Sequence, residues 1–124
     1  MKEIIAVVRM NMMNRTKTAL TEAGVDAFFA NEAQGRGQGF ANLMLLEGAE
    51  RGYEEAVEHL GGKGKLYPKR ILTVVVPEDE VDGIVETIIE TNKTGKPGDG
   101  KIWVLPVKDA VRVRTGESGI KSIS

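Results

Sequence analysis

Short apolar runs alternate with two amphipathic stretches along the chain, and this pattern predicts strands separated by helices. The runs at 4–8 and 69–77 are rich in β-branched residues, which is typical of buried strands. A less clearly patterned run at 25–33 and the short runs at 102–105 and 110–114 complete the predicted strands. Five strands are therefore expected.

Two stretches have the periodicity of helices. The clearer stripe falls at positions i, i+3, i+4, i+7 and i+8 and consists of Val81, Ile84, Val85, Ile88 and Ile89. Residues 78–80 are all acidic and would lie at the positive end of that helix. A weaker stripe from 16 to 23 predicts an earlier helix, which Asn11 or Asn14 would cap and Gly24 would end.

The order of these elements is βαβ, a long loop, βαβ and a short terminal strand. It predicts one domain over 1–124 with an α+β, ferredoxin-like βαββαβ sandwich and both helices on one sheet face. Residues 38–66 would form a functional loop between the halves, because so long a segment without firm pattern is unusual in a small domain. Residues 116–124 would be a short tail. Since 74–76 are apolar at consecutive positions, both faces of that strand should be buried, which favours a homo-oligomer packed sheet against sheet.

Composition narrows the classes of partner. The net charge of −1 and only six aromatic residues argue against a nucleic-acid partner. No apolar run approaches the ~20 residues of a membrane span, so no membrane insertion is expected. The chain has no cysteine, which excludes disulfides and fits a cytoplasmic protein.

A glycine-rich stretch at 94–104 is the first candidate for chemistry. Gly95, Gly100 and Lys101 match part of the P-loop pattern, but Ile102 replaces the magnesium-binding hydroxyl residue, and the stretch runs from helix to strand. The P-loop interpretation therefore fails. A phosphate nest remains open, since glycine N–H groups and a lysine are suited to an anion.

Arg112 and Arg114 lie two residues apart on the predicted last strand and would share a face. Together with Lys101 and the N–H groups of Gly98 and Gly100 they could surround a polyphosphate. The competing interpretation is a solvated edge strand.

The segment Gly35-Arg36-Gly37-Gln38 is a second candidate loop, although such spacing is more often a turn. Gln38 could coordinate Mg²⁺ or meet a small ligand. Lys69 could neutralise a carboxylate or be an ordinary surface lysine. His59 is expected in solvent and Trp103 in the core. No nucleophile or general base is recognisable, so the chain is not expected to be an enzyme.

The stretch from Thr94 to Val104 resembles the C-terminal signature of PII nitrogen-regulatory signal proteins, and Arg112–Glu117 looks like the arginine-bearing segment that follows it. Glu32 with the two glycines at 35 and 37, then 68–69 and 74–77, fit the same family in order. The resemblance implies a trimer of ferredoxin-like subunits with ATP or ADP in the clefts between them.

The resemblance also assigns roles to single residues. Phosphates or ribose would be held by Gly98, Asp99, Gly100 and Lys101, and across the interface by Arg112 and Arg114. The nucleotide cleft would be lined by Gly35, Gly37 and Val75, with Phe29 in place of a threonine that meets the adenine. Lys69 matches the lysine that binds 2-oxoglutarate beside Mg-ATP. Gln38 is the best match to the glutamine of that site and the tentative Mg²⁺ contact, although Gly37-Gln38-Gly39 departs from the family's Gly-Arg-Gln-Lys-Gly.

The long loop would be the T-loop through which such proteins contact their partners. It lacks the family's Tyr-Arg-Gly-x-Glu-Tyr modification motif, which makes uridylylation doubtful. Together with the segment 14–17, this loop is similar to that of the nitrogenase-associated branch, in which two PII paralogues act together to inhibit nitrogenase and 2-oxoglutarate relieves the inhibition. The expected protein is a sensor of ATP/ADP and 2-oxoglutarate, either a homotrimer or a hetero-oligomer with a paralogue. An ammonium transporter or a metabolic enzyme as the target, a weak nucleotidase, and a structural trimer with a degenerate site remain alternatives.

Overall fold

The computed structural model describes residues 1–25, 27–37 and 66–124 of the chain. Its strands are β1 (Lys2–Arg9), β2 (Phe29–Gly35), β3 (Tyr67–Val76) and β4 (Lys101–Pro106). Its α-helices are α1 (Met13–Glu22) and α4 (Val81–Asn92), and three short 3₁₀ helices are η1 (Met10–Met12), η2 (Glu78–Glu80) and η3 (Gly119–Ile123). The expected T-loop at 38–66, except Leu66, lies outside the described residues, as does His59.

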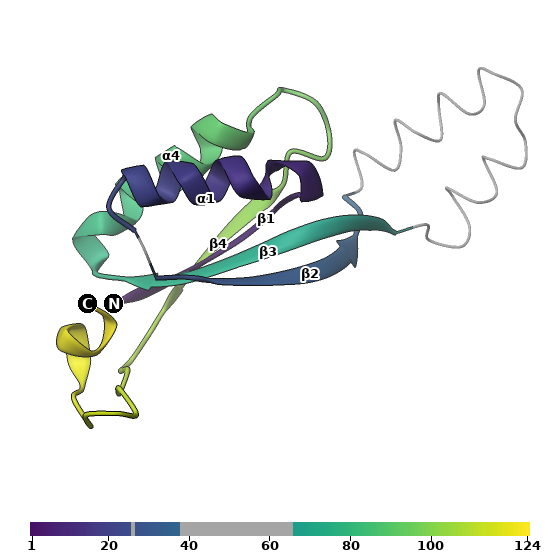
Figure 1. Cartoon of the computed structure of the whole chain (residues 1–124). Coiled ribbons are helices and arrows are strands. Elements are labelled where there is room, and N and C mark those ends of the chain that lie inside the picture. The colour runs from purple at the N-terminus through teal and green to yellow at the C-terminus, as the bar shows by residue number, and fades with distance from the viewer. Residues whose placement is uncertain (26, 38–65) are drawn as a thin grey trace, which may run out of the picture.

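The four strands form one antiparallel sheet in the order β2-β3-β1-β4. Both helices cover the same face of this sheet (Figure 1). β1 and β2 run parallel with β3 between them, which is the split βαβ arrangement. The ferredoxin-like α+β fold expected from the sequence is confirmed.

The core lies between the sheet and the helices. Alternate residues of β1 and β3 point into it, so that Ile4 and Val8 of β1 and Leu72 of β3 are buried. They pack against a cluster that includes Leu20 of α1 and Ile88 of α4. The apolar stripe predicted for α4 is confirmed for most of its members; Ile89, at the sheet edge, is 46% exposed.

Both helix ends of α1 were predicted, and only one prediction is right. Gly24 has φ +91° and completes a Schellman end, in which the N–H of Val25 donates to the carbonyl of Leu20 at 2.8 Å. Neither Asn11 nor Asn14 caps the start. The chain enters through η1, the residue before the helix is Met12, and no side chain caps it.

Two strand predictions need correction. The second strand spans 29–35 instead of 25–33, because the Schellman end and its exit occupy the first residues. The run at 110–114 is not a strand: within the described residues its only ladder contact is an isolated bridge between Val111 and Ser118. Turns at Val113–Thr115 interrupt the extended backbone there.

The second sheet face is open in the single chain. Ile5 and Val75 lie on it and are only partly buried, and Trp103, expected in the core, is 47% exposed there. Phe29 at the start of β2 is 75% exposed. The prediction that both faces of β3 are buried is therefore met on the helix side alone.

Candidate functional site

The glycine-rich stretch forms a tight loop between α4 and β4, organised by one carboxylate. The Oδ2 atom of Asp99 accepts the N–H groups of Thr94 at 2.8 Å and Gly95 at 3.0 Å. The hydroxyl of Thr94 donates to the other carboxylate oxygen. Asp99 thus closes the loop on itself, and its charge is already engaged inside the chain.

Two cations from the sheet hold this loop in place. Arg9, the last residue of β1, donates to Asp99 Oδ1 at 2.6 Å and to the carbonyl of Pro97 at 3.0 Å. Lys69 of β3, which is paired with Arg9 in the sheet, donates to the carbonyl of Gly98 at 3.1 Å. The loop is therefore fixed to the sheet by charge-assisted hydrogen bonds.

These contacts shift two pKa values. Desolvation raises the pKa of Asp99, but hydrogen bonds from Thr94, Arg9 and Gly95 outweigh it and hold that pKa well below its usual range. The pKa of Lys69 is lowered, first by desolvation and second by the positive charge of Arg9, while Asp99 partly offsets this. An anion placed beside Lys69 would offset the positive charge of Arg9 and favour the protonated ammonium group.

Gly100 is the position where the loop needs glycine. Its φ is +121°, and a Cβ built on it would lie 2.0 Å from the carbonyl oxygen of Val7 in β1. The backbone of the loop therefore presses directly on the neighbouring strand. Any other residue would require the loop or β1 to move.

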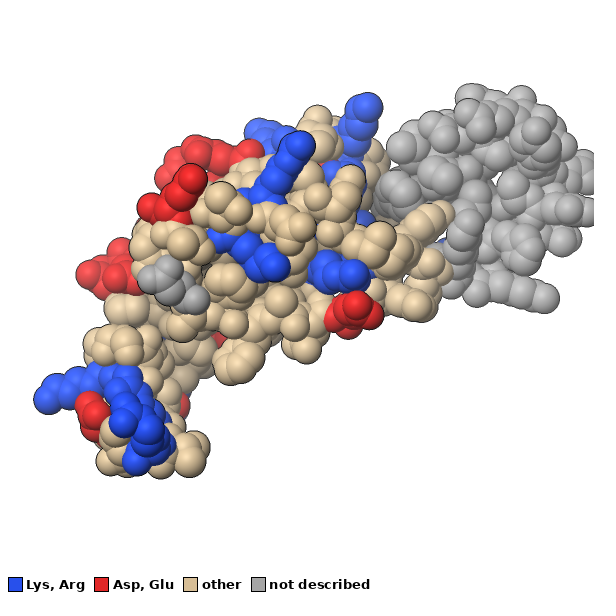
Figure 2. Space-filling view, viewed as in Figure 1, with Lys and Arg blue, Asp and Glu red and all other residues tan. Residues whose placement is uncertain are grey.

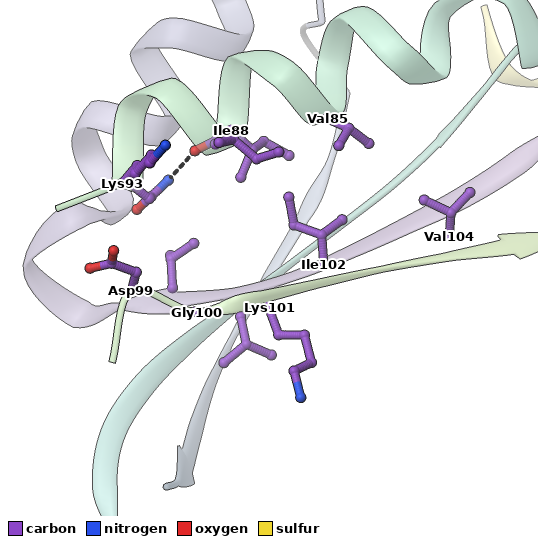
Figure 3. A pocket seen from close by; sticks show the side chains of 12 residues that line it. Val85, Ile88, Lys93, Asp99, Gly100, Lys101, Ile102 and Val104 are labelled. Atoms are coloured by element: carbon purple, nitrogen blue, oxygen red, sulfur yellow. Dashed lines mark hydrogen bonds between the residues drawn. The ribbon is translucent and has the colours of Figure 1, made fainter. Parts of the chain in front are cut away.

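The start of β4 separates two hollows. In Figure 3, Ile102 and Val104 point toward Val85 and Ile88 of α4, whereas Lys101 points to the other side of the strand. The hollow on the helix side has about 390 Å³ and a mostly apolar lining. The second hollow has about 350 Å³ and lies on the open face of the sheet, where Lys101 is part of its lining.

The second hollow collects most of the residues that the sequence had singled out. Its polar or glycine lining consists of Gln34, Gly35, Arg36, Gly37, Lys69, Gly98, Gly100 and Lys101. Its apolar floor includes Val7, Ile71 and Trp103. The nitrogen Nζ of Lys101 lies 6.0 Å from the centre of the Trp103 ring. Glycine N–H groups and two lysines around an apolar floor suit a ligand that combines phosphate with an apolar ring.

Phe29, Val75 and the two arginines lie at the other end of the sheet. Phe29 is paired with Thr73, whereas Gly35 is paired with Tyr67, so the two ends of β2 are about 20 Å apart. Val75 is at the same end as Phe29, six positions along β3 from Lys69. In Figure 1 the C-terminal segment also lies at this end, away from the loop that joins α4 to β4.

The two arginines are not arranged as the sequence suggested. They were expected to share a strand face and to join Lys101, but they lie in a turn-rich segment after β4, and one chain does not bring them to the glycine loop. Arg112 folds back on the C-terminal segment, donating to the carbonyls of Lys121 at 3.1 Å and Ser124 at 2.8 Å. Arg114 is exposed and makes no hydrogen bond or ion pair with the residues described.

No metal centre is built from the described part of the chain, where no group of three or more His, Asp or Glu side chains could hold an ion. Gln38, the tentative Mg²⁺ contact, lies outside the described residues. None of the described helices is long and apolar enough to cross a membrane.

Arg9 is a residue of this candidate site that was not among those expected from the sequence. The signal was present in the alternation of β1, because Arg9 lies two residues after Val7 and so shares the open face with it. What the sequence did not give was the register that places Arg9 beside Lys69 and Asp99. Trp103, which was expected in the core, lines the hollow.

Comparison with known proteins shows that this chain is similar to a family of proteins over most of its length. Residues 1–117 match the model of the family described as nitrogen regulatory protein P-II. The chain is 44% identical over 123 residues to the nitrogen fixation nifHD region GlnB-like protein 2 of Methanobacterium ivanovii, covering 99% of both chains. It is 42% identical to the protein of the same name from Methanococcus maripaludis, over 99% of this chain and all of that one.

A relative that carries the plain family name gives the same result. The nitrogen regulatory protein P-II 2 of Methanothermobacter thermautotrophicus is 38% identical, covering 99% of this chain and 97% of its own. Among solved structures, Arabidopsis thaliana PII bound to citrate superposes with a TM-score of 0.71 at 31% identity, covering 98% of this chain and 90% of that chain.

Proposed function

This chain belongs to the nitrogen regulatory protein P-II family, in its nitrogenase-associated branch, and from this premise we propose that it senses ATP, ADP and 2-oxoglutarate and controls nitrogenase. The observation that carries the proposal is the second hollow, where Gly98, Gly100 and Lys101 meet Lys69 and the 35–37 segment. Regulation of nitrogen metabolism is the function of the family. The ligands and the target are the proposed part.

The donor set fits the phosphates of a nucleotide. Gly98 and Gly100 have positive φ, which lets the loop turn its N–H groups where side chains would block them, and Lys101 adds a cation at the same opening. Asp99, Arg9 and Thr94 would serve this site by keeping the loop in shape. Bound Mg²⁺ would supply a Lewis acid on the phosphates, with Gln38 as its proposed protein contact.

The separation of the candidates into two groups supports a shared site. Phe29, Val75 and the arginines lie at the end of the sheet opposite the glycine loop, so the two halves can meet only between subunits. In a cyclic trimer, each cleft would take its loop from one subunit and its arginines from the next. Packing around the axis would also cover the open face with Ile5, Val75 and Leu105.

Lys69 would bind a carboxylate group of 2-oxoglutarate. Its ammonium group lies at the hollow with a lowered pKa, so a dicarboxylate beside it would gain a charge-assisted contact and relieve the charge of Arg9. The effector would then favour one arrangement of the 38–66 segment, through which we propose contact with a nitrogenase component. A paralogue as co-subunit is part of this proposal.

Calorimetry tests the sensing. We expect 2-oxoglutarate to bind only when Mg-ATP is present, and Lys69→Ala to weaken it at least tenfold, with Lys17→Ala on α1 as the matched control. Equal binding without nucleotide would contradict the proposal. Sustained phosphate release from ATP would instead identify a nucleotidase.

The regulatory target needs its own assay. Purified nitrogenase mixed with this chain, alone and with its paralogue, should lose activity with ATP and recover it when 2-oxoglutarate is added. Capture of an ammonium transporter, with no effect on nitrogenase, would redirect the proposal to the other class of target.

A further inference from the structure

The segment after β4 folds into a hook that is closed by its own backbone. The N–H of Arg112 donates to the carbonyl of Glu117 and the N–H of Gly116 donates to the carbonyl of Arg112, both at 2.8 Å. Gly119 donates to the carbonyl of Ala110 at 3.1 Å. Residues 119–124, which contain η3, are thereby turned back toward the guanidinium of Arg112.

The guanidinium of Arg112 is the centre of this hook. Its Nη2 atom donates to the carbonyls of Lys121 and Ser124, at 3.1 and 2.8 Å. Its Nη1 atom lies 3.7 Å from Glu117 Oε1. The carbonyls of residues 121 and 124 thus occupy donors that a phosphate would need, and the Glu117 carboxylate partly balances the positive charge.

Two apolar side chains of the same segment face the end of the sheet across a hollow. Ile120 and Ile123 line a hollow of about 310 Å³ together with Val25 and the strand end 74–77. Val75, one of the residues expected in the nucleotide cleft, is part of that lining. Residues 119–124 therefore hydrogen-bond to Arg112 and line a hollow with Val75, which are two members of the same proposed half-site.

Arg114 provides an internal contrast. It follows Arg112 by two positions, yet it is exposed and makes no hydrogen bond or ion pair with the part of the chain that the structure describes. Figure 2 shows basic side chains gathered on this end of the molecule. The proposed function assigns both arginines to phosphates. Arg112 is hydrogen-bonded to the C-terminal segment, whereas Arg114 is accessible to a ligand.

We propose that residues 119–124 form an autoinhibitory tail that competes with nucleotide phosphates for Arg112; the inference rests on the proposed nucleotide site. Phosphate oxygens are charged and bind guanidinium more strongly than amide carbonyls do, so a bound nucleotide can displace the tail. Because only the released fraction of the protein binds fully, the tail lowers apparent affinity. Nucleotide binding and tail release are then linked in both directions.

The test uses the full chain and changes the apolar side chains by which residues 119–124 face the end of the sheet. Ile120→Ser/Ile123→Ser replaces the two apolar side chains that line this hollow without adding charge near Arg112, and Val113→Ser, at a side chain that is fully exposed, is the matched control. We expect the double variant to bind Mg-ATP several-fold more tightly in calorimetry and the control to bind as the wild type does. Hydrogen exchange is expected to show faster exchange of the Glu117–Ser124 amides when Mg-ATP is added to the wild type.

Arg112→Ala separates the tail from the ligand. Without nucleotide it should also speed exchange at 117–124, because it removes the two carbonyl contacts. If nucleotide binds but the tail amides and the double variant's affinity do not change, the autoinhibitory inference is overturned while the proposed function stands. If the wild type binds no nucleotide at millimolar concentration, the proposed function fails and the inference falls with it.

Discussion

Arg9 and Asp99 are 90 positions apart in the sequence and form an ion pair with 2.6 Å between Nη1 and Oδ1. The pair connects the last residue of the first strand to the loop that precedes the last strand. Asp99 also accepts the backbone N–H groups of Thr94 and Gly95. One carboxylate thus connects the glycine loop to itself and to the sheet.

Asp99→Asn should loosen the glycine loop. The substitution keeps the size of the side chain but removes the charge, and we expect a loss of about 1–2 kcal/mol in unfolding free energy, which is modest because the site is partly exposed. Chemical denaturation measures it. Glu86→Gln, an exposed carboxylate on α4, is the matched control and should change stability by less than about 0.5 kcal/mol.

The stabilising effect of Asp99 should depend on pH in a defined direction. Its pKa is lower in the folded state than the ordinary 3.8, so its contribution is complete above that value and is lost as pH falls toward the folded pKa. The stability difference between wild type and Asp99→Asn should therefore shrink below about pH 3.8. A difference that stays constant through that range would contradict the assignment.

Gly100→Ala and Gly83→Ala should have opposite effects. At Gly100 a methyl group would meet the carbonyl oxygen of Val7 at 2.0 Å, so we expect a loss of more than about 2 kcal/mol and weakened nucleotide binding. Gly83 lies in α4 with open space around it, and alanine there should stabilise by about 0.5–1 kcal/mol. Thermal unfolding of both variants checks the pair.

Lys69 predicts a pH limit for effector binding. A dicarboxylate binds the protonated ammonium, so affinity should be full below the pKa of Lys69 and fall as pH rises through it. Because that pKa is lowered from 10.5, the fall should begin at a lower pH than for an ordinary lysine. Titrating 2-oxoglutarate affinity with Mg-ATP present, in wild type and Lys69→Arg, measures the shift; the arginine variant should lack it.

Thr16→Val should lower the stability of the fold by removing a hydrogen bond between α1 and α4. Asn92, which is 5% exposed, donates to Thr16 Oγ1 at 3.1 Å and to the carbonyl of Ile88 at 2.9 Å. Valine leaves one of these buried donors unpaired, at a cost of about 1–3 kcal/mol. Thr18→Val is the control, since its hydroxyl is exposed and bonds only within α1. Equal stability of the two variants in urea would contradict this account.

The fold could be predicted because local patterns and the fold agree. The alternation of β1 and β3, the stripe of α4 and Gly24 each specify their element from neighbouring residues. Residues 110–114 alternate in the same way and are not a strand, because a strand needs a partner and the described part of one chain offers them only a bridge. Trp103 was misplaced for a related reason, since a face left open in one chain carries core-like residues.

The site could be predicted as a set of residues but not as an arrangement. Glycines and lysines at 98–101 indicate an anion nest without any register. The contacts of Arg9 with Asp99 and of Lys69 with Gly98 depend on strand pairing across the sheet. The position of Arg112 depends on backbone carbonyls of residues 121 and 124, which no side-chain pattern indicates.

The two ends of the sheet have a consequence for stoichiometry. A lone subunit would own one half of each of two different binding sites, so the number of complete sites equals the number of interfaces. Affinity for nucleotide should then rise with protein concentration until assembly is complete. In a ring that also contains a paralogue, every interface between unlike chains would pair the glycine loop of one protein with the arginines of the other. The ratio of the two subunits would then set the affinity for nucleotide.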